Sequence, residues 1–143
     1  MFRLAALMAF IASPAPAWEF SASPLCTLEH ATGEVAVRIT YDAALPEYTI
    51  ALTLRDGAWP ASDGFSIVFG GGRALTIGTD RHSLSGDGRT LTVTDTGFGN
   101  VLNGLEFNSI ATAIAGSRRV DIPLQDAGEP VQAFRACPAP GLS

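Results

Sequence analysis

Polar and apolar residues alternate along several segments of the chain. In the segment 35–41 the odd positions are Val, Val, Ile and Tyr, and in the segment 48–55 the even positions are Tyr, Ile, Leu and Leu. Thr, Ala and Arg stand between them, so each segment is predicted to be a β-strand that buries one face. Shorter runs of strand-forming residues predict further strands at 65–69, 73–78, 89–94, 110–114 and 118–122.

The links between these segments have the composition of turns. Three glycines occupy 70–72, the run 85–88 is Ser-Gly-Asp-Gly, and Gly116-Ser117 suits a two-residue hairpin turn. We expect Asp87 and Asp95 to cap turns rather than to hold a calcium ion, because neither run reproduces a calcium-loop pattern. Strands spaced this regularly, with short links, predict a meander rather than βαβ units.

Two segments have helical spacing instead. Between 98 and 105 the apolar residues follow the i, i+3, i+4, i+7 pattern, and near the C-terminus Asp126 precedes Glu129 by three residues, a variant of the capping box. Cys137 lies on one face of the helix that is predicted to follow. The predicted fold class is therefore α+β and mostly β: an antiparallel sheet or sandwich with two short helices.

The first 17 residues have the layout of a signal peptide. Arg3 provides the positive charge, 4–12 is apolar, and Ala15-Pro16-Ala17 fits the small-x-small cleavage pattern. Nine apolar residues are too few to cross a bilayer, which takes about 20 in a helix; a short membrane anchor and a buried helix are the alternatives. We expect residues 1–17 to be the signal peptide, residues 18–143 to be one mature domain, and the protein to be periplasmic or secreted.

The chain has two cysteines, Cys26 and Cys137. In an oxidising compartment they are expected to form a disulfide, which would tie the C-terminal helix to the N-terminal region. A catalytic thiol and an intermolecular bridge are the alternatives. We favour the structural disulfide because a thiol-redox catalyst normally has a Cys-x-x-Cys pair, which this sequence lacks.

The C-terminal segment runs Arg119-Val-Asp-Ile-Pro-Leu124 and then Gly128-Glu-Pro-Val-Gln-Ala-Phe-Arg-Ala-Cys137. A strand, a short turn and a helix that ends in a cysteine resemble the end of secreted bacterial proteins of the invasion-associated locus B type. The resemblance covers roughly the last 40 residues, the leader and Cys26. It implies a small exported β-rich protein of the envelope or the medium, and it brings no catalytic residues to this chain.

Composition excludes several classes of function. Nine basic against 14 acidic residues leave a net charge of −5, which is unsuited to a nucleic-acid binder. The glycines at 70–72 precede Arg73, but a phosphate-binding loop needs a lysine and the chain has none. We expect no cofactor. His30 and His82 are far apart in sequence, and both cysteines are expected to be paired, so we expect no metal site.

One cluster has the residue types of a hydrolase. Asp80 and His82 are two residues apart, and Ser83 follows. A working triad also needs a base bonded to both nucleophile and acid, together with oxyanion donors. Because the cluster lies between predicted strands, we favour a solvated polar turn as its explanation.

Trp59 lies in a turn-rich loop, next to Pro60. Loop aromatics often contact partners, so Trp59 is a possible recognition residue; the alternative, which we favour, is that it covers one end of the sheet. Three functions stay open: a non-catalytic periplasmic or secreted binding protein with an unknown protein or glycan partner, a small hydrolase using His82, Asp80 and a serine, and a structural envelope component. The oligomeric state is open too.

Overall fold

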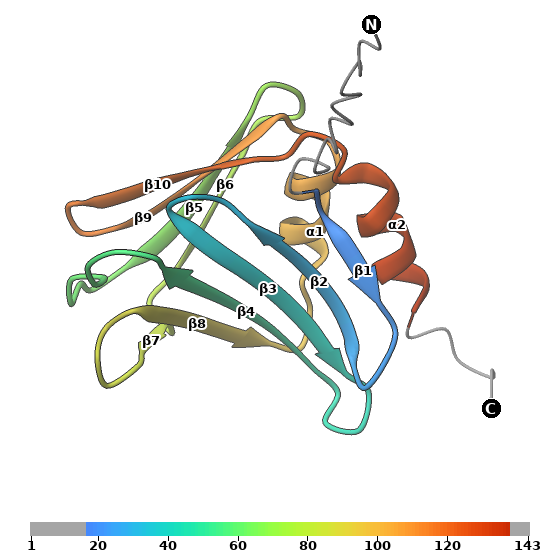
Figure 1. Cartoon of the computed structure of the whole chain (residues 1–143), viewed down its shortest axis with the longest axis horizontal. Helices are drawn as coiled ribbons and strands as arrows, with labels where there is room; N and C mark the ends of the chain where they lie inside the picture. The colour runs from blue at the N-terminus through green and yellow to red at the C-terminus, as the bar shows by residue number, and fades with distance from the viewer. Residues whose placement is uncertain (1–16, 138–143) are drawn as a thin grey trace, which may run out of the picture.

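The protein is a sandwich of two antiparallel β-sheets with two short helices beside them (Figure 1). The structure is a computed structural model, and it describes residues 17–137. Sheet A has the order β1 (Glu19–Ser21), β2 (Cys26–Ala31), β3 (Val35–Asp42), β4 (Glu47–Leu54), β8 (Thr90–Asp95), β7 (Ser83–Leu84). Sheet B has the order β10 (Arg118–Pro123), β9 (Ile110–Ala115), β5 (Phe65–Gly70), β6 (Leu75–Thr79), and the helices are α1 (Gly99–Glu106) and α2 (Gly128–Ala136).

This architecture confirms the predicted fold class, and the predicted strands and helices are present with small shifts in their bounds. The strands β1, β2 and β7 were not predicted. The predicted meander is wrong: β4 pairs with β8 rather than with β5. After β4 the chain crosses to sheet B, forms the hairpin β5–β6 there, and returns to sheet A through β7.

Trp59 lies in the segment where the chain crosses between the sheets. Its side chain is only 2% exposed, and its indole Nε1–H donates a hydrogen bond to the carbonyl oxygen of Leu52 at 3.0 Å. The ring meets Phe65 of β5 edge-on, with 6.4 Å between centroids. Trp59 therefore covers the end of the core, as the favoured interpretation expected, and it is too buried to be a recognition residue.

The core lies between the inward faces of the sheets. The hairpin β3–β4 is paired without interruption from Val35↔Leu54 to Asp42↔Glu47. Because directly paired residues share a face in an antiparallel pair, this register places Val37 and Leu52 side by side in the interior, where both are buried. The alternation in the sequence thus determines which face of sheet A is covered.

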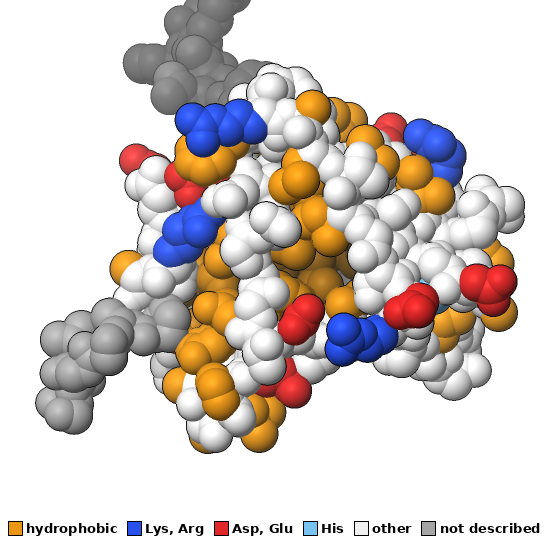
Figure 2. Space-filling view, turned by 180° about the vertical axis from the view of Figure 1, so that it is seen from behind, with side chains coloured by type: hydrophobic (Ala, Val, Ile, Leu, Met, Phe, Trp, Pro, Cys, Tyr) orange, Lys and Arg blue, Asp and Glu red, His pale blue; other side chains and the backbone are white. Residues whose placement is uncertain are grey.

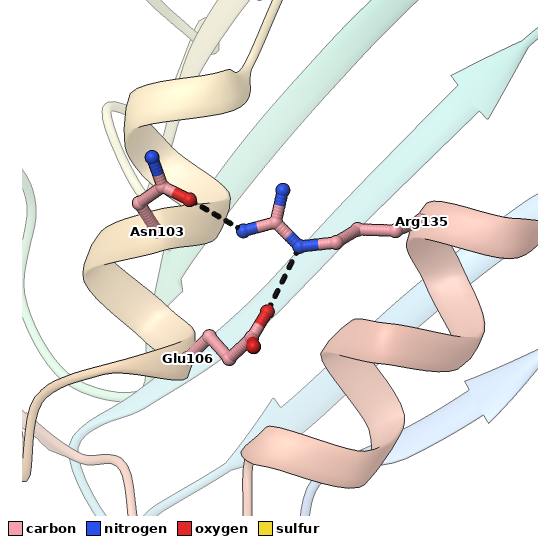
Figure 3. A network of polar contacts seen from close by, with 3 residues as sticks. All are labelled: Asn103, Glu106 and Arg135. Carbon is pink, nitrogen blue, oxygen red and sulfur yellow. Dashed lines mark hydrogen bonds and ion pairs between the residues drawn. The ribbon is translucent and has the colours of Figure 1, made fainter.

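The helices are held to the sandwich and to each other. Gly104 of α1 lies against the ring of Phe69 on β5, so closely that a Cβ there would come within 2.4 Å of ring carbons. Arg135 of α2 reaches across to α1, where its Nε donates to Glu106 Oε1 at 2.9 Å and its Nη2 donates to Asn103 Oδ1 at 2.7 Å (Figure 3). These contacts join α1 to sheet B and α2 to α1.

The start of α2 differs from the prediction. No capping box forms: the N-cap residue is Ala127, and no side chain caps the helix. Asp126 instead adopts a positive φ of 61°, which turns the chain between Leu124 and the helix. Asp tolerates this left-handed conformation better than most residues, so the aspartate serves the turn rather than the helix end.

The disulfide between Cys26 and Cys137 is present, with 6.0 Å between the Cα atoms. It joins the first residue of β2 to the end of α2, and α2 packs on β1 and β2. The expected link between the N-terminal region and the C-terminal helix is confirmed. The predicted signal peptide lies almost wholly outside the described residues.

The disulfide closes a loop that spans 111 residues of sequence. In the chain-entropy model, replacing Cys26 and Cys137 together by Ala should lower the free energy of unfolding by about 4–5 kcal/mol, because the unfolded chain regains its freedom. Urea denaturation measures the loss. Dithiothreitol should destabilise the wild type similarly and leave the double variant unchanged; a loss below about 1 kcal/mol would contradict the prediction.

Two glycines of α1 form a matched pair for testing how the helix packs. Gly104→Ala should destabilise the protein by about 1–3 kcal/mol, because the new methyl group must displace Phe69 or the helix. Gly99→Ala meets nothing within 4 Å, so it should be neutral or stabilise by up to about 1 kcal/mol. Thermal denaturation of both variants checks the difference, and equal melting temperatures would disprove the close packing.

Candidate functional site

A cleft of about 490 Å³ opens between the two sheets on the side where β8 and β6 lie. Its walls come from β4 and β8 of sheet A, from β5 and β6 of sheet B, and from the amino end of α1. Figure 2 shows the molecule from this side: hydrophobic side chains line a hollow near the middle of the view, and charged side chains lie along its lower margin.

The floor of the cleft is apolar. In sheet A, Ile50 pairs directly with Val93, and in sheet B, Ile67 pairs directly with Ile77. Both pairs line the cleft from opposite walls. The rest of the apolar lining is made by Phe65, Phe98 and Val101. Ile77 and Val93 are only partly buried, so each wall leaves one of its paired residues half open to solvent.

Polar groups surround the cleft mouth. The polar side chains are those of Thr79, Arg81, Asp95 and Asn100; Thr94 also lines the cleft, but its hydroxyl lies on the outer face of sheet A, 3.3 Å from that of Thr49. Arg81 is exposed and makes no ion pair within residues 17–137, whereas Asp95 accepts the backbone N–H of Thr96 at 2.6 Å as a turn cap. The helix α1 begins here without a side-chain cap. The arrangement provides an apolar interior with hydrogen-bonding groups at its edge.

The residues of the hydrolase alternative do not form a catalytic triad in the described part of the chain. The His82 ring lies 6.2 Å from the ring of Phe65, and its buried Nδ1 has no hydrogen-bond partner. The side-chain hydrogen bonds of residues 17–137 include none between His82 and Asp80 or Ser83. His82 therefore packs beside the core, outside the cleft lining, without a nucleophile or an acid bound to it.

The two aspartates expected to cap turns do so. Asp87 Oδ1 accepts a hydrogen bond from the Ser85 hydroxyl at 2.7 Å and another from the backbone N–H of Arg89 at 3.0 Å. These bonds favour the ionised carboxylate and hold the pKa of Asp87 below its ordinary value. The turn-capping role of Asp87 and Asp95 is confirmed by their contacts.

His30 is part of the interior near the start of the described chain. Its ring stacks on Trp18 with 4.8 Å between centroids and 17° between the planes, while the Trp18 indole N–H donates to the carbonyl oxygen of Pro123 at 3.1 Å. Within residues 17–137, no three His, Cys, Asp or Glu side chains lie close enough together to hold a metal ion. No helix in this part of the chain is long and apolar enough to cross a membrane.

Sequence reasoning did not find the cleft. The sequence predicts strands that contain Ile77 and Val93, but the pattern of a strand looks the same whether its face is covered or open. The available signal was the run Gly97-Phe98-Gly99 directly before a helical pattern, which brings an aromatic side chain between two residues without side chains. Comparisons of the chain with family models, with curated proteins and with solved structures give no match.

An aromatic cluster packs against Phe98, one of the residues that line the cleft. The Tyr48 ring stacks on Phe98 at 5.4 Å and lies 4.4 Å from the ring of Tyr41, with Phe134 of α2 at 6.2 Å. Burial raises the pKa of Tyr48, a contribution from Tyr41 raises it further, and the Arg135 guanidinium acts in the opposite direction. The Phe98 wall of the cleft is thus anchored to both helices.

The raised pKa of Tyr48 can be tested because the chain has only two tyrosines. In Tyr41→Phe the single remaining phenol should ionise above the ordinary value of about 10, since burial is the largest cause. Adding Arg135→Gln should raise the pKa again. Above pH 10 the unfolded chain loses its proton first, so the free energy of unfolding should fall as pH rises. Ultraviolet titration of the phenolate measures the midpoint, and an ordinary midpoint would contradict the burial.

Proposed function

We propose that this protein is an exported, non-catalytic binding domain whose working site is the cleft between the two sheets. The observation that carries the proposal is the apolar lining of the cleft. Each sheet contributes one directly paired set of residues to it, Ile50 with Val93 and Ile67 with Ile77. A volume of about 490 Å³ lies in the range of small binding sites, and such sites combine apolar walls with a few polar groups at the edge.

The chemistry of the lining favours binding over catalysis. The described residues that line the cleft include no histidine, cysteine or serine, and the one carboxylate among them, Asp95, accepts a hydrogen bond from Thr96 rather than from the hydroxyl of Thr79 or Thr94. Thr79 and Asn100 contribute a hydroxyl and an amide group at the mouth, where hydrogen bonds orient a ligand. Apolar walls and orienting hydrogen bonds together provide affinity and specificity without a bond-breaking step.

Export is part of the proposal. A disulfide fits an oxidising compartment, and the N-terminal pattern together with the resemblance to secreted proteins of the invasion-associated locus B type agrees with a periplasmic or extracellular location. Between the two partner classes considered, the cleft favours a protein segment over a glycan. Its floor presents mainly aliphatic side chains, and Trp59, the loop aromatic suited to stacking on a sugar, is buried.

The proposed site is tested with a neutral apolar dye, N-phenyl-1-naphthylamine, whose fluorescence rises in apolar surroundings. Ile77→Gln should weaken dye binding roughly tenfold, because the cleft loses apolar area worth about 1–1.5 kcal/mol. The matched control is Ile114→Gln, which changes another half-buried strand isoleucine of sheet B outside the cleft lining. Equal dye affinity in both variants, with unchanged melting curves, would refute the site.

A further inference from the structure

We propose that the partner of the cleft is an extended peptide, which pairs as an additional strand with the free edge of β6 and places every second side chain in the cleft. This inference rests on the proposed function and specifies the kind of partner. The main chain of the peptide would provide affinity through backbone hydrogen bonds, and the cleft would select its side chains.

The free edge of β6 is unusually suited to strand pairing. Among the described strands, β6 pairs with β5 alone, in an unbroken register from Phe65↔Thr79 to Phe69↔Leu75. Its five residues, Leu-Thr-Ile-Gly-Thr, include no charged residue and no proline. The edge therefore presents a row of backbone N–H and C=O groups with nothing in the strand to repel or block an incoming chain.

The other edge strands in the described chain have features that oppose pairing with a further strand, namely short length, charged residues or proline. The edge strand β1 has three residues and β7 has two, which is too short for extensive pairing. The edge strand β10 carries Arg118, Arg119, Asp121 and Pro123 among its six residues. Charges, proline and short length all discourage pairing between edges, so β6 is the one of the four described edge strands that lacks such protection.

The position of β6 beside the cleft connects the edge to the site. Ile77 and Thr79 face the cleft, while Thr76 faces outward and is exposed. A strand added beyond β6 would continue the same pleat, so its alternate side chains would point toward the cleft and the β8 wall. That wall is also open: β7 pairs only with Leu91 and Thr92 of β8, so Val93 has a strand neighbour on its β4 side alone.

A second copy of this chain suits the edge less well than a separate peptide. In the symmetric antiparallel register that pairs all five β6 residues, Ile77 meets its own counterpart. Arg73 before the strand then lies opposite Arg81 after it, at both ends of the interface. Like charges directly opposite each other destabilise a strand pair. The partner of the β6 edge is therefore a separate extended peptide with apolar residues at alternate positions.

The test selects peptides with the oxidised protein from a phage-displayed library of random peptides about 12 residues long, enough to span a strand. We expect enriched sequences with alternating apolar residues. Thr76→Lys should weaken the selected peptide roughly tenfold, since an edge lysine opposes pairing. Val68→Lys is the matched control: it adds the same charge to the same outer face, on a strand already paired on both sides by β6 and β9. Melting curves verify that both variants fold.

Hydrogen exchange then shows where the peptide binds. Binding should slow amide exchange in residues 75–79, and a peptide N-methylated at alternate residues should lose both binding and protection, because it cannot complete the backbone pairing. The strand proposal is overturned if no peptide is enriched, or if the bound peptide leaves β6 exchange unchanged. Dye binding distinguishes the failure of strand pairing at β6 from the failure of the cleft as a binding site. If no peptide pairs with β6 but the dye still binds, the cleft remains the proposed site. If the dye does not bind either, the proposed function fails as well.

Discussion

The structure depends on how the inward faces of two sheets of unequal width are covered. Sheet A has six strands and sheet B has four, so sheet B cannot cover all of sheet A. On one side the helix α2 packs over β1 and β2 and completes the cover. On the other side only the start of α1 approaches β8, and the cleft is the part of the interior that stays open. The difference in width between the two sheets therefore accounts both for the helix that covers one side and for the cleft that stays open on the other.

The covered side is also the tightly joined side. The disulfide holds the end of α2 to β2, Arg135 joins α2 to α1, and Gly104 lets α1 approach Phe69 on sheet B. These links connect both sheets, and the strand β2 with the last described helix, at one side of the sandwich. The β6–β8 side has no comparable link among the described contacts, so a partner can enter there without breaking an internal bond.

Much of the fold was predictable because it depends on local pattern. Alternation identified the long strands, and the helical spacing before Glu106 identified α1. The sheet order was not predictable, since whether β4 pairs with β5 or with β8 depends on contacts between distant segments, including the burial of Trp59. The strand β2 escaped notice because His30 occupies an inward position where alternation leads one to expect an apolar residue.

The candidate site was missed for a different reason. Sequence reasoning looked for function in loops, where Trp59 and the Asp80–Ser83 segment are, but the structure places the one in the core and leaves the other without catalytic contacts. The cleft is made of strand residues whose types are ordinary for a buried face. What distinguishes Ile77 and Val93 is that each has a neighbouring strand on one side only and stays partly exposed, although both would be better buried. The open apolar wall lies beside the unprotected edge of β6. One extended segment bound there would bury the apolar side chains of the wall and also pair with the free backbone groups of the edge.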